Sequence, residues 1–325
     1  MDDLLGIQDL RVYYHERERT VRAVDALDLA LTRGRTLAIV GESGCGKTTL
    51  ALSILNLVPA PGSIETGRII FDGRDVLAMT GDELRRVRGR RISMIFQDPT
   101  SGLNPVMPVG EQVEEIVRTH LDASRKESRR LALEALARQG LSEPERIGAA
   151  YPFQLSGGMC QRVMIAIATV LRPNLLIADE PTSALDVTVQ AGILREIEAL
   201  KADIGAAVLL ITHDLGVVAQ IADEVAVMYA GRIVECGPTA DVYARPQHPY
   251  TAALMAARPR LDERDRMLAP IRGAPPDLGE LDGRCAFLPR CGKAVNACRS
   301  EPWPGLRASG GDGQSAACFN PVYHG

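Results

Sequence analysis

Short apolar runs alternate with segments of helical periodicity along the first two-thirds of this chain. Thr36–Val40 is one such run, and Leu50–Leu57 follows it with apolar residues at helical spacing. Leu175–Ala178 and Ala207–Thr212 are further runs of strand length, joined by the helix-rich segment Val187–Asp203. Strands that alternate with helices predict an α/β fold around a mostly parallel sheet.

Turn-forming pairs and a change of composition divide the chain further. Asp72-Gly73 separates two strand-like stretches and predicts a hairpin, because an Asp-Gly pair supplies positive φ, and a second hairpin is predicted around Ala230-Gly231. Residues from about 98 to 160 have a mostly helical pattern. After residue 244 Pro and Gly become frequent and the pattern turns irregular. We therefore expect a domain over residues 1–244 with a helical subdomain at about 98–160, and an irregular extension over 245–325.

Composition narrows the classes of protein that fit. The net charge is −4, whereas a nucleic-acid surface needs a basic excess, so no nucleic-acid partner is expected. The most apolar stretches, Val163–Leu171 and Ala206–Ile211, are far shorter than the ~20 residues that cross a bilayer. The N-terminus is acidic where a secretory signal would be basic. Any association with a membrane is therefore expected to come through a partner.

One segment has the full pattern of a phosphate-binding loop. Gly41–Thr48 reads Gly-Glu-Ser-Gly-Cys-Gly-Lys-Thr and matches G-x-x-x-x-G-K-[ST]. The strand before it and the helix after it are the required context, because backbone N–H groups and the helix N-terminus then converge on an anion. Lys47 is expected to reach the outer phosphates of ATP, and the Thr48 hydroxyl to hold Mg²⁺. Cys45, inside the loop, is expected to be the site of inactivation by thiol reagents.

Polar residues follow other predicted strands, at the edge where a parallel sheet collects its ligands. Asp179 is expected to hold Mg²⁺ through water, and Glu180 to polarise the attacking water as general base. His213 follows Ala207–Thr212, where it could contact the γ-phosphate, although a lone histidine there is more often structural. Gln97 follows another apolar run, and its neutral amide can bind both Mg²⁺ and the attacking water.

A further motif, Leu155–Arg162, reads Leu-Ser-Gly-Gly-Met-Cys-Gln-Arg and stands between the phosphate loop and Asp179. Together with Gln97, residues 183–186 (Ser-Ala-Leu-Asp) and His213, it follows the motif order of ATP-binding cassette (ABC) proteins, and the chain resembles that superfamily. The resemblance implies an α/β fold: an ABC-type P-loop nucleotide-binding domain with a helical subdomain. It also implies a site shared by two chains, because in ABC proteins this signature meets the γ-phosphate held by the other subunit.

The resemblance gives each motif residue an expected role. Tyr14 stands where ABC subunits place the aromatic that stacks on adenine, with the adjacent Tyr13 as the alternative. The expected contacts to ATP are Tyr14, Gly41, Ser43, Gly44, Cys45, Gly46, Lys47, Thr48, Thr49 and Gln97. The expected catalytic residues are Glu180, His213, Gln97 and Lys47, and the expected Mg²⁺ ligands are Thr48, Gln97 and Asp179. The residues expected to serve the partner's nucleotide are Ser156, Gly157, Gly158 and Gln161, with Asp186 in the D-loop.

The closer resemblance is to ATP-binding subunits of bacterial dipeptide/oligopeptide importers. It is carried by Met94–Pro99, Leu176–Thr182, His248–Thr251 and Cys285–Cys291, and it runs nearly from end to end of the chain. Phe153 departs from the pattern, because these importers commonly have His before the signature. That position has no catalytic role in this interpretation.

Four of the seven cysteines gather near the C-terminus: Cys285, Cys291, Cys298 and Cys318. In a cytosolic chain such a group points to metal or cluster ligation before disulfides. Four thiolates suit zinc or an iron–sulfur cluster, and the spacing alone leaves the choice open. Some members of the importer family use this pattern to ligate a 4Fe–4S cluster. The resemblance therefore implies a structural 4Fe–4S cluster, with zinc as the alternative.

These features together predict an ATPase that powers import of di- or oligopeptides from the cytoplasmic face of the cell membrane. Its expected partners are a second ABC ATPase subunit (related or identical), two transmembrane permease subunits and an extracytoplasmic solute-binding protein. The same motor could serve nickel or another small solute, because permease and binding protein select the cargo. A soluble ABC protein acting in DNA repair or on ribosomes is disfavoured, since such proteins insert coiled coils or fuse two ATPase domains. A catalytically dead subunit is disfavoured by the complete set of catalytic residues.

Overall fold

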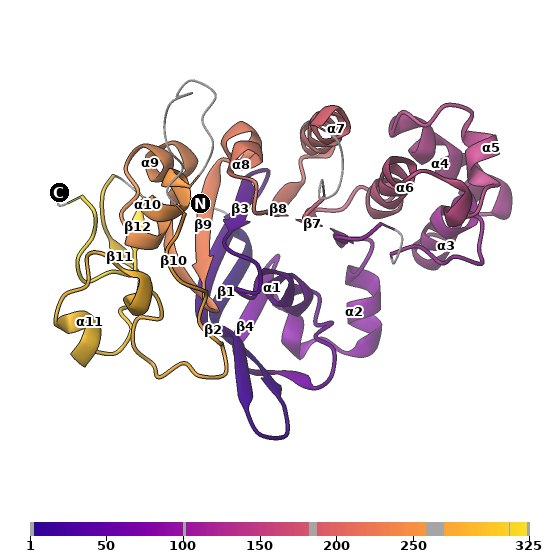
Figure 1. Cartoon of the computed structure of the whole chain (residues 1–325). Helices are drawn as coiled ribbons and strands as arrows, with labels where there is room; N and C mark the ends of the chain where they lie inside the picture. The colour runs from indigo at the N-terminus through magenta and orange to yellow at the C-terminus, as the bar shows by residue number, and fades with distance from the viewer. Residues whose placement is uncertain (1–2, 100–101, 182–186, 258–269, 312, 324–325) are drawn as a thin grey trace. The chain divides into compact units, whose positions relative to one another are not determined.

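The chain forms two compact units (Figure 1). The first comprises residues 78–210 with the short segments 1–4 and 32–35, and the second comprises 5–31, 36–77 and 211–325. The structure is a computed structural model, and the residues that it describes are 3–99, 102–181, 187–257, 270–311 and 313–323.

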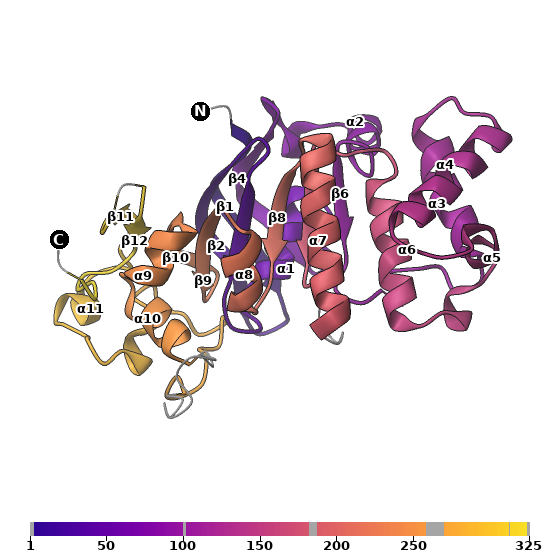
Figure 2. The ribbon, with the colours of Figure 1, turned by 90° about the horizontal axis from the view of Figure 1, so that it is seen from above.

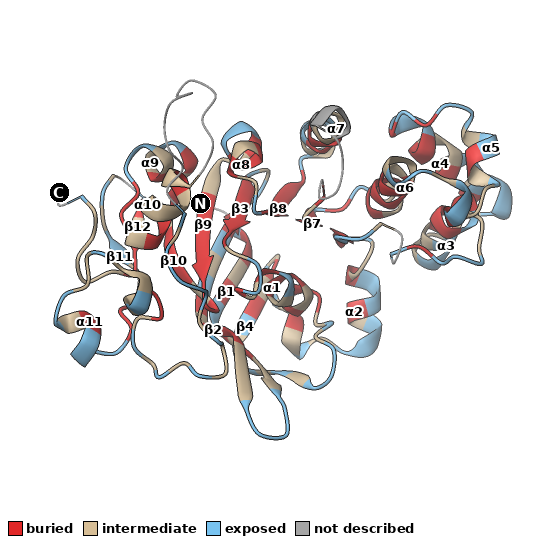
Figure 3. Ribbon diagram, viewed as in Figure 1, coloured by how far each residue is buried: buried red, intermediate tan, exposed pale blue. Residues whose placement is uncertain are grey.

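The centre of the second unit is a sheet that contains β3 (Thr36–Val40), β9 (Glu224–Tyr229) and β10 (Arg232–Pro238). β3 runs parallel to β9, and β9 pairs antiparallel with β10 through the predicted hairpin turn, where Ala230 and Gly231 have φ of 47° and 81°. Every residue of β3 is buried, as its unbroken apolar run predicts (Figure 3). Two helices, α8 (Leu215–Ile221) and α9 (Thr239–Ala244), pack on this sheet.

A second, antiparallel sheet has the strand order β2-β1-β4-β5. Its strands are β1 (Asp3–His15), β2 (Thr20–Thr32), β4 (Gly62–Phe71) and β5 (Arg74–Asp75), followed by the 3₁₀ helix η1 (Val76–Ala78). The turn at Asp72-Gly73, with φ of 49° and 76°, confirms the predicted hairpin between β4 and β5. The sheet itself was not predicted from the sequence. The sequence pattern predicted a mostly parallel sheet; β3 and β9 pair in parallel, whereas β9 with β10, β1 with β4 and β4 with β5 pair antiparallel.

In the first unit, β6 (Ile92–Ile95) pairs parallel with β7 (Leu175–Asp179) over four residue pairs from Ile92↔Leu175 to Ile95↔Ala178. β8 (Ala207–Ile211) is the next strand beside β7, and α7 (Val187–Ile204) connects the two. β7 and β8 are buried along their whole length. The three strands match the apolar runs of the sequence. A short helix, α2 (Gly81–Val87), precedes β6.

The rest of the first unit is a group of helices that pack on one another (Figure 1). They are α3 (Val109–His120), α4 (Arg125–Arg138), α5 (Pro144–Gly148) and α6 (Gly157–Thr169), with the 3₁₀ helix η2 (Pro152–Gln154). Their apolar faces enclose one core, to which α3 contributes Val113, α4 Leu136 and α6 Val163, each 0% exposed. These helices occupy the stretch in which the sequence predicts a helical subdomain.

The C-terminal part of the second unit has short elements, as its composition predicts, but it is anchored to the central sheet (Figure 2). β12 (Ser315–Ala316) pairs antiparallel with β10, and the Gln314 amide donates to the buried Glu235 carboxylate at 2.8 Å. Phe287 and Trp303 are buried, so the segment has apolar packing of its own. Its other elements are α10 (Pro249–Ala256), η3 (Leu288–Arg290), α11 (Ala297–Ser300) and β11 (Arg307–Ala308).

Candidate functional site

The phosphate-loop pattern lies between the end of β3 and the start of α1 (Lys47–Ile54), as the sequence predicts. Two of its glycines are required by close backbone contacts. A Cβ atom at Gly41 would lie 2.2 Å from the Met228 carbonyl oxygen, and one at Gly46 would lie 2.0 Å from that of Ala23. Gly46 also has φ of 105°, which L side chains rarely adopt. The loop therefore has a fixed path that only glycine permits at these points.

Lys47 curls back over this loop. Its ammonium group is buried and donates to the carbonyl oxygens of Gly41 at 2.8 Å and Glu42 at 3.0 Å. Thr48 is exposed at the first turn of α1, and Ser43 and Gly44 form the exposed outer part of the loop. A cation, a hydroxyl and a helix N-terminus therefore gather at one place, which is the combination that binds a phosphate and its Mg²⁺.

The adjacent tyrosines of β1 make different contacts. The Tyr14 hydroxyl lies 3.5 Å from the Thr49 hydroxyl on α1, whereas the Tyr13 hydroxyl donates to Asp25 at 2.7 Å. Successive side chains of a strand point to opposite faces, which explains the difference. Tyr14 is thus the tyrosine beside the phosphate loop.

His213 is exposed and lies on the loop between β8 and α8. The preceding residue, Thr212, donates its backbone N–H to the Ile39 carbonyl of β3 at 3.2 Å, and Asp214 caps α8 by accepting the Gly216 N–H at 2.7 Å. These two bonds fix the backbone on either side of His213. They place it next to the strand that leads into the phosphate loop.

The carboxylates of the first unit lie where β7 ends. Asp179 is its last residue and is 1% exposed, while Glu180 is half-buried with φ of 46°. A non-glycine residue in this region stores roughly 1–3 kcal/mol of strain, which is common at functional sites. The Gln97 amide, just beyond the neighbouring strand β6, donates to the Glu180 carboxylate at 3.1 Å. The structure therefore brings Gln97 and Glu180 together.

The Ser-Gly-Gly signature opens α6. Ser156 is the N-cap residue, and its hydroxyl accepts the Met159 N–H at 3.3 Å. Ser156 and Gly157 are exposed. Gln161 instead is 2% exposed, and its amide donates to the Pro181 carbonyl at 2.8 Å, so it ties α6 to the segment after β7. Asp186, expected in the D-loop, lies outside the described residues.

The candidate residues thus form two groups. Gly41–Thr49, Tyr14 and His213 belong to the second unit, whereas Gln97, Asp179–Glu180 and the signature belong to the first. Each group has its own internal contacts, given above.

Cys45 is poorly placed for attack by thiol reagents. Its side chain is 5% exposed, and burial raises the pKa of the thiol, an effect that nearby Lys47 only partly offsets. Reactive cysteines are partly exposed and have lowered pKa values. The structure therefore corrects the expectation that Cys45 is the site of inactivation. Its contribution is to the packing of the loop.

The four C-terminal cysteines line one cavity, together with Phe287 and Lys293 among others. Burial, together with the three other thiols, raises the pKa of Cys285 to about 11, and burial with two of the thiols likewise raises that of Cys318 to about 11. Within the described parts of the chain, no three His, Cys, Asp or Glu side chains are placed to hold a metal ion. The four thiols expected to hold the cluster therefore share one cavity, but the described residues contain no preformed site for a metal ion.

Two residues that the sequence did not single out also contact the phosphate loop. Tyr250 of α10 accepts the Glu42 N–H at 2.9 Å, and Arg290 of η3 pairs with the Glu42 carboxylate. Both lie in stretches that carry the family resemblance. No motif rule, however, links a residue so far along the chain to the loop.

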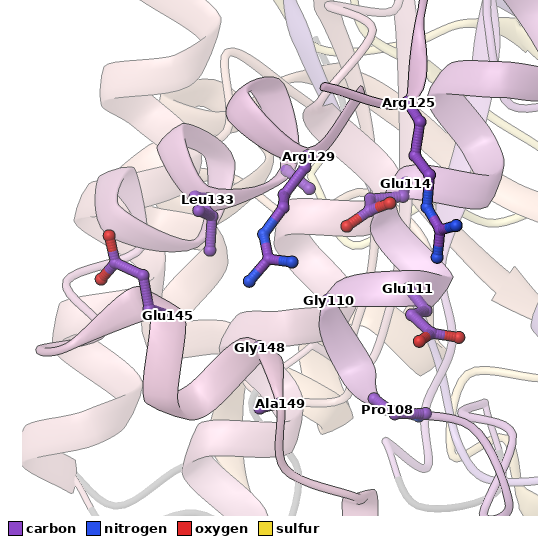
Figure 4. Close-up of a pocket in the computed structure, with 11 residues that line it drawn as sticks. Pro108, Gly110, Glu111, Glu114, Arg125, Arg129, Leu133, Glu145, Gly148 and Ala149 are labelled. Atoms are coloured by element: carbon purple, nitrogen blue, oxygen red, sulfur yellow. The ribbon is translucent and has the colours of Figure 1, made fainter. Parts of the chain in front are cut away.

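Another pocket lies among α3, α4 and α5 (Figure 4). Arg125 and Arg129 face Glu111 and Glu114 across it, and Glu145 lies at its α5 side. It contains none of the expected nucleotide contacts. Its three carboxylates outnumber its two guanidinium groups, so the net charge of the lining does not favour a polyphosphate. We therefore assign it no part in nucleotide binding.

No helix among the described residues is both long enough and apolar enough to span a bilayer.

Comparison with known proteins gives consistent matches along the chain. Residues 24–183 match the family model described as ABC transporter, and residues 234–298 that of the oligopeptide/dipeptide transporter C-terminal region. The dipeptide transport ATP-binding protein DppD of Bacillus subtilis is 45% identical, over 92% of this chain and 89% of that protein. The oligopeptide transport ATP-binding protein OppD of Escherichia coli is 46% identical, over 99% of this chain and 94% of that protein.

Solved structures agree with these matches. The dimeric, post-hydrolysis structure of the ATP-binding cassette MJ0796 bound to ADP and Pi has a TM-score of 0.65 and 29% identity, and it covers 72% of this chain and 98% of that one. The cbiO1 structure from Clostridium perfringens, part of an ABC transporter complex, has a TM-score of 0.64 and 27% identity over 75% of this chain and 92% of that one.

Proposed function

Because this chain belongs to the ATP-binding subunits of bacterial peptide ABC transporters, we propose that it hydrolyses ATP to drive import of di- or oligopeptides. The observation that carries the proposal is the phosphate loop, with Lys47 folded over it, in a chain that also matches the peptide-transporter C-terminal region. The ABC match alone would support an ATPase of any cargo. The C-terminal match and the full-length relatives point to peptides.

The proposed chemistry is in-line hydrolysis of the γ-phosphate. The loop N–H groups and Lys47 hold the phosphates, and Thr48 and Asp179, with Gln97, would hold Mg²⁺, which neutralises charge on the phosphate oxygens. Glu180 accepts a proton from water as the water oxygen bonds to the γ-phosphorus and the bond to the β-phosphate oxygen breaks. The Gln97–Glu180 hydrogen bond orients that carboxylate. The products are ADP and inorganic phosphate.

The proposal requires the two groups of candidate residues to act on one ATP molecule, with a second chain completing the site. The exposed Ser156 hydroxyl and the first N–H groups of α6 suit a phosphate that another chain holds. Gln161, being buried, supports this helix from within instead. The dimeric ATP-binding cassette structures that resemble this chain support such a pairing. Asp186 and Tyr14 keep their proposed roles beside the second chain and the adenine.

We further propose two permease subunits and an extracytoplasmic solute-binding protein as partners, with this chain on the cytoplasmic face of the membrane. The helical subdomain at about 98–160 would receive the permease. In support, the two most exposed large apolar side chains of the described residues belong to it: Val106 at 81% and Phe153 at 75%. The proposed division is an ATPase domain over 1–244 and an importer-type extension over 245–325.

Reconstitution tests the proposal. The chain, its permeases and a second ATPase subunit in vesicles should take up a labelled dipeptide only with ATP inside and the binding protein outside. Lys47→Ala should abolish uptake, whereas Lys126→Ala, which removes an exposed lysine of α4, should not. Uptake of nickel but not of peptide would show that the transported substrate is a small solute instead. ATP hydrolysis that no permease or solute alters would favour a soluble ABC ATPase.

For the C-terminal cysteines we propose a structural 4Fe–4S cluster on Cys285, Cys291, Cys298 and Cys318. All four thiols line one cavity, and Lys293 in its wall complements an anionic cluster. Zinc on the same four thiols is the alternative. Among the described residues no group of His, Cys, Asp or Glu side chains is already placed to hold a metal ion, so metal analysis decides between the two.

Cys298→Ser is expected to lower the iron and acid-labile sulfide content of anaerobically purified protein and to remove a broad absorbance in the blue. Cys236→Ser is the control, because that thiol is not part of the cavity wall. Iron and sulfide analysis with absorption spectra would decide. Zinc in place of iron, or metal content unchanged in Cys298→Ser, would contradict the cluster.

A further inference from the structure

Glu42, the second residue of the phosphate loop, is held at two points by the C-terminal part of the second unit. Its carboxylate oxygens pair with both terminal nitrogens of Arg290, at 2.6 and 3.0 Å. Its backbone N–H donates to the Tyr250 hydroxyl at 2.9 Å. The Arg290 side chain is 4% exposed and that of Glu42 is 24% exposed, so water competes little for this pair.

Arg290 is itself fixed by its surroundings. Its Nε donates to the Arg272 carbonyl at 2.9 Å, and one terminal nitrogen also donates to the Tyr229 hydroxyl at 3.2 Å. The guanidinium lies 5.9 Å from the ring centres of both Tyr229 and Phe287. Contacts with the Arg272 carbonyl, the Tyr229 hydroxyl and the Glu42 carboxylate therefore hold the Arg290 side chain in one orientation.

The aromatic rings beside Arg290 form one packed group. Tyr229 lies 4.5 Å from Tyr250 and 5.4 Å from Phe287, and Phe287 lies 5.5 Å from Tyr250, all between ring centres. Phe287 and Arg290 are both on the segment between Cys285 and Cys291. That segment therefore packs on Tyr250 and reaches Glu42 through Arg290.

Glu42 also matters to the residues that would bind phosphate. Its carbonyl oxygen accepts from the Lys47 ammonium at 3.0 Å and from the Cys45 N–H at 3.3 Å. A shift of Glu42 would thus move the loop backbone and the lysine together. Rigid placement of such groups before the ligand arrives is what raises affinity.

We infer that Arg290 is a positioning residue for ATP: through Glu42 it holds the phosphate loop in its binding shape and links that shape to the four-cysteine segment. The inference rests on the proposed ATP binding. Arg290 touches neither ATP nor the reacting atoms. Its role is to hold the Glu42 carboxylate, and Tyr250, which accepts the Glu42 N–H, adds the second point of attachment.

The test is Mg-ATP affinity in Arg290→Met, which keeps an unbranched apolar side chain but removes the charge and the guanidinium donors. Its dissociation constant should rise about tenfold, the scale of one coupled pair, while kcat at saturating ATP stays within about twofold. Arg290→Lys keeps the charge but cannot pair through two nitrogens. Its dissociation constant should therefore lie between those of wild type and Arg290→Met. Arg284→Met is the control, since Arg284 is an exposed arginine just before Cys285 that pairs with Asp282.

A double-mutant cycle separates positioning from general loss of structure. If Arg290 acts through Glu42, adding Glu42→Gln to Arg290→Met should raise the dissociation constant no further than the larger single change. Thermal unfolding reports the folded fraction of each variant. Affinity within twofold of wild type in Arg290→Met, or fully additive effects, would overturn the inference. Failure of wild type and Arg284→Met to bind Mg-ATP would instead refute the proposed function.

Discussion

Glu180→Gln is expected to abolish multiple-turnover hydrolysis while Mg-ATP still binds. Glutamine keeps the size of the side chain but cannot accept a proton from water, so kcat should fall about 10²- to 10⁴-fold. Binding should persist, because the substitution leaves the phosphate loop unchanged, where the Lys47 ammonium is held by the carbonyl oxygens of Gly41 and Glu42. Phosphate release under saturating ATP, together with equilibrium dialysis of labelled ATP, measures both quantities.

Glu198→Gln is the matched control, because Glu198 is an exposed glutamate on α7 of the same unit. It should leave both quantities within about twofold of wild type, as exposed substitutions usually do. If Glu180→Gln retained multiple turnover, the base assignment would be wrong, and another group would have to accept the proton. If it lost ATP binding as well, Glu180 would have a role in holding the nucleotide or the fold.

Gly46→Ala is expected to weaken Mg-ATP binding by at least about 100-fold, because a backbone clash and a strained φ together cost about 3 kcal/mol and each ~1.4 kcal/mol is tenfold in affinity. The added Cβ would lie 2.0 Å from the Ala23 carbonyl oxygen, and φ of 105° is strained for alanine. The clash is with backbone, so the loop has to shift. The Gly46 carbonyl also accepts the Leu50 N–H at 2.9 Å, so the first turn of α1 would shift with it.

Gly44→Ala is the matched control within the same loop. Gly44 also has positive φ, at 79°, but a Cβ there would meet nothing within 4 Å. Only the backbone preference of alanine then opposes the native shape, about 1–2 kcal/mol, so affinity should stay within roughly tenfold of wild type. Titration of both variants with Mg-ATP gives the comparison. Equal losses in the two would mean that flexibility, not the contact with Ala23, explains the glycine at 46.

The sequence predicts those parts of the fold whose signals are local. β3, β7 and β8 are unbroken apolar runs, because strands buried on both faces have no polar side, and each matches its predicted bounds within one residue. The phosphate loop follows from its glycine spacing and from the strand and helix on either side. Ser124 accepts the Glu127 N–H at 3.2 Å and so begins α4, and a serine followed three residues later by glutamate is likewise a local signal.

The antiparallel sheet escaped prediction because its pattern is interrupted and its pairing is distant. In β1 the pairing register shifts between Gln8 and Arg11, where Asp9 has φ of 41°, so the two-residue alternation breaks at that point. Its partner β4 begins only at Gly62. Hydrophobic periodicity depends on residues close in sequence, and it does not indicate which strands pair.

The candidate site shows the same limit at the level of single side chains. Motif spacing located Gln97 and Glu180 but could not show that their side chains meet at 3.1 Å. It grouped Gln161 with the exposed signature residues, although this side chain is buried. The pair of Glu42 and Arg290 spans 248 positions and belongs to no motif, so only the folded chain reveals it.

Hydrolysis of ATP at a site shared by two chains is tested by specific activity against protein concentration, with sedimentation in parallel. Turnover per chain should fall toward zero as the chains dissociate, whether the second chain is a copy or a related subunit supplied in the mixture. Glu180→Gln with Mg-ATP should sediment as a dimer of chains at concentrations where the nucleotide-free protein is a monomer. Constant turnover per chain down to concentrations at which only monomers sediment would contradict hydrolysis at a shared site.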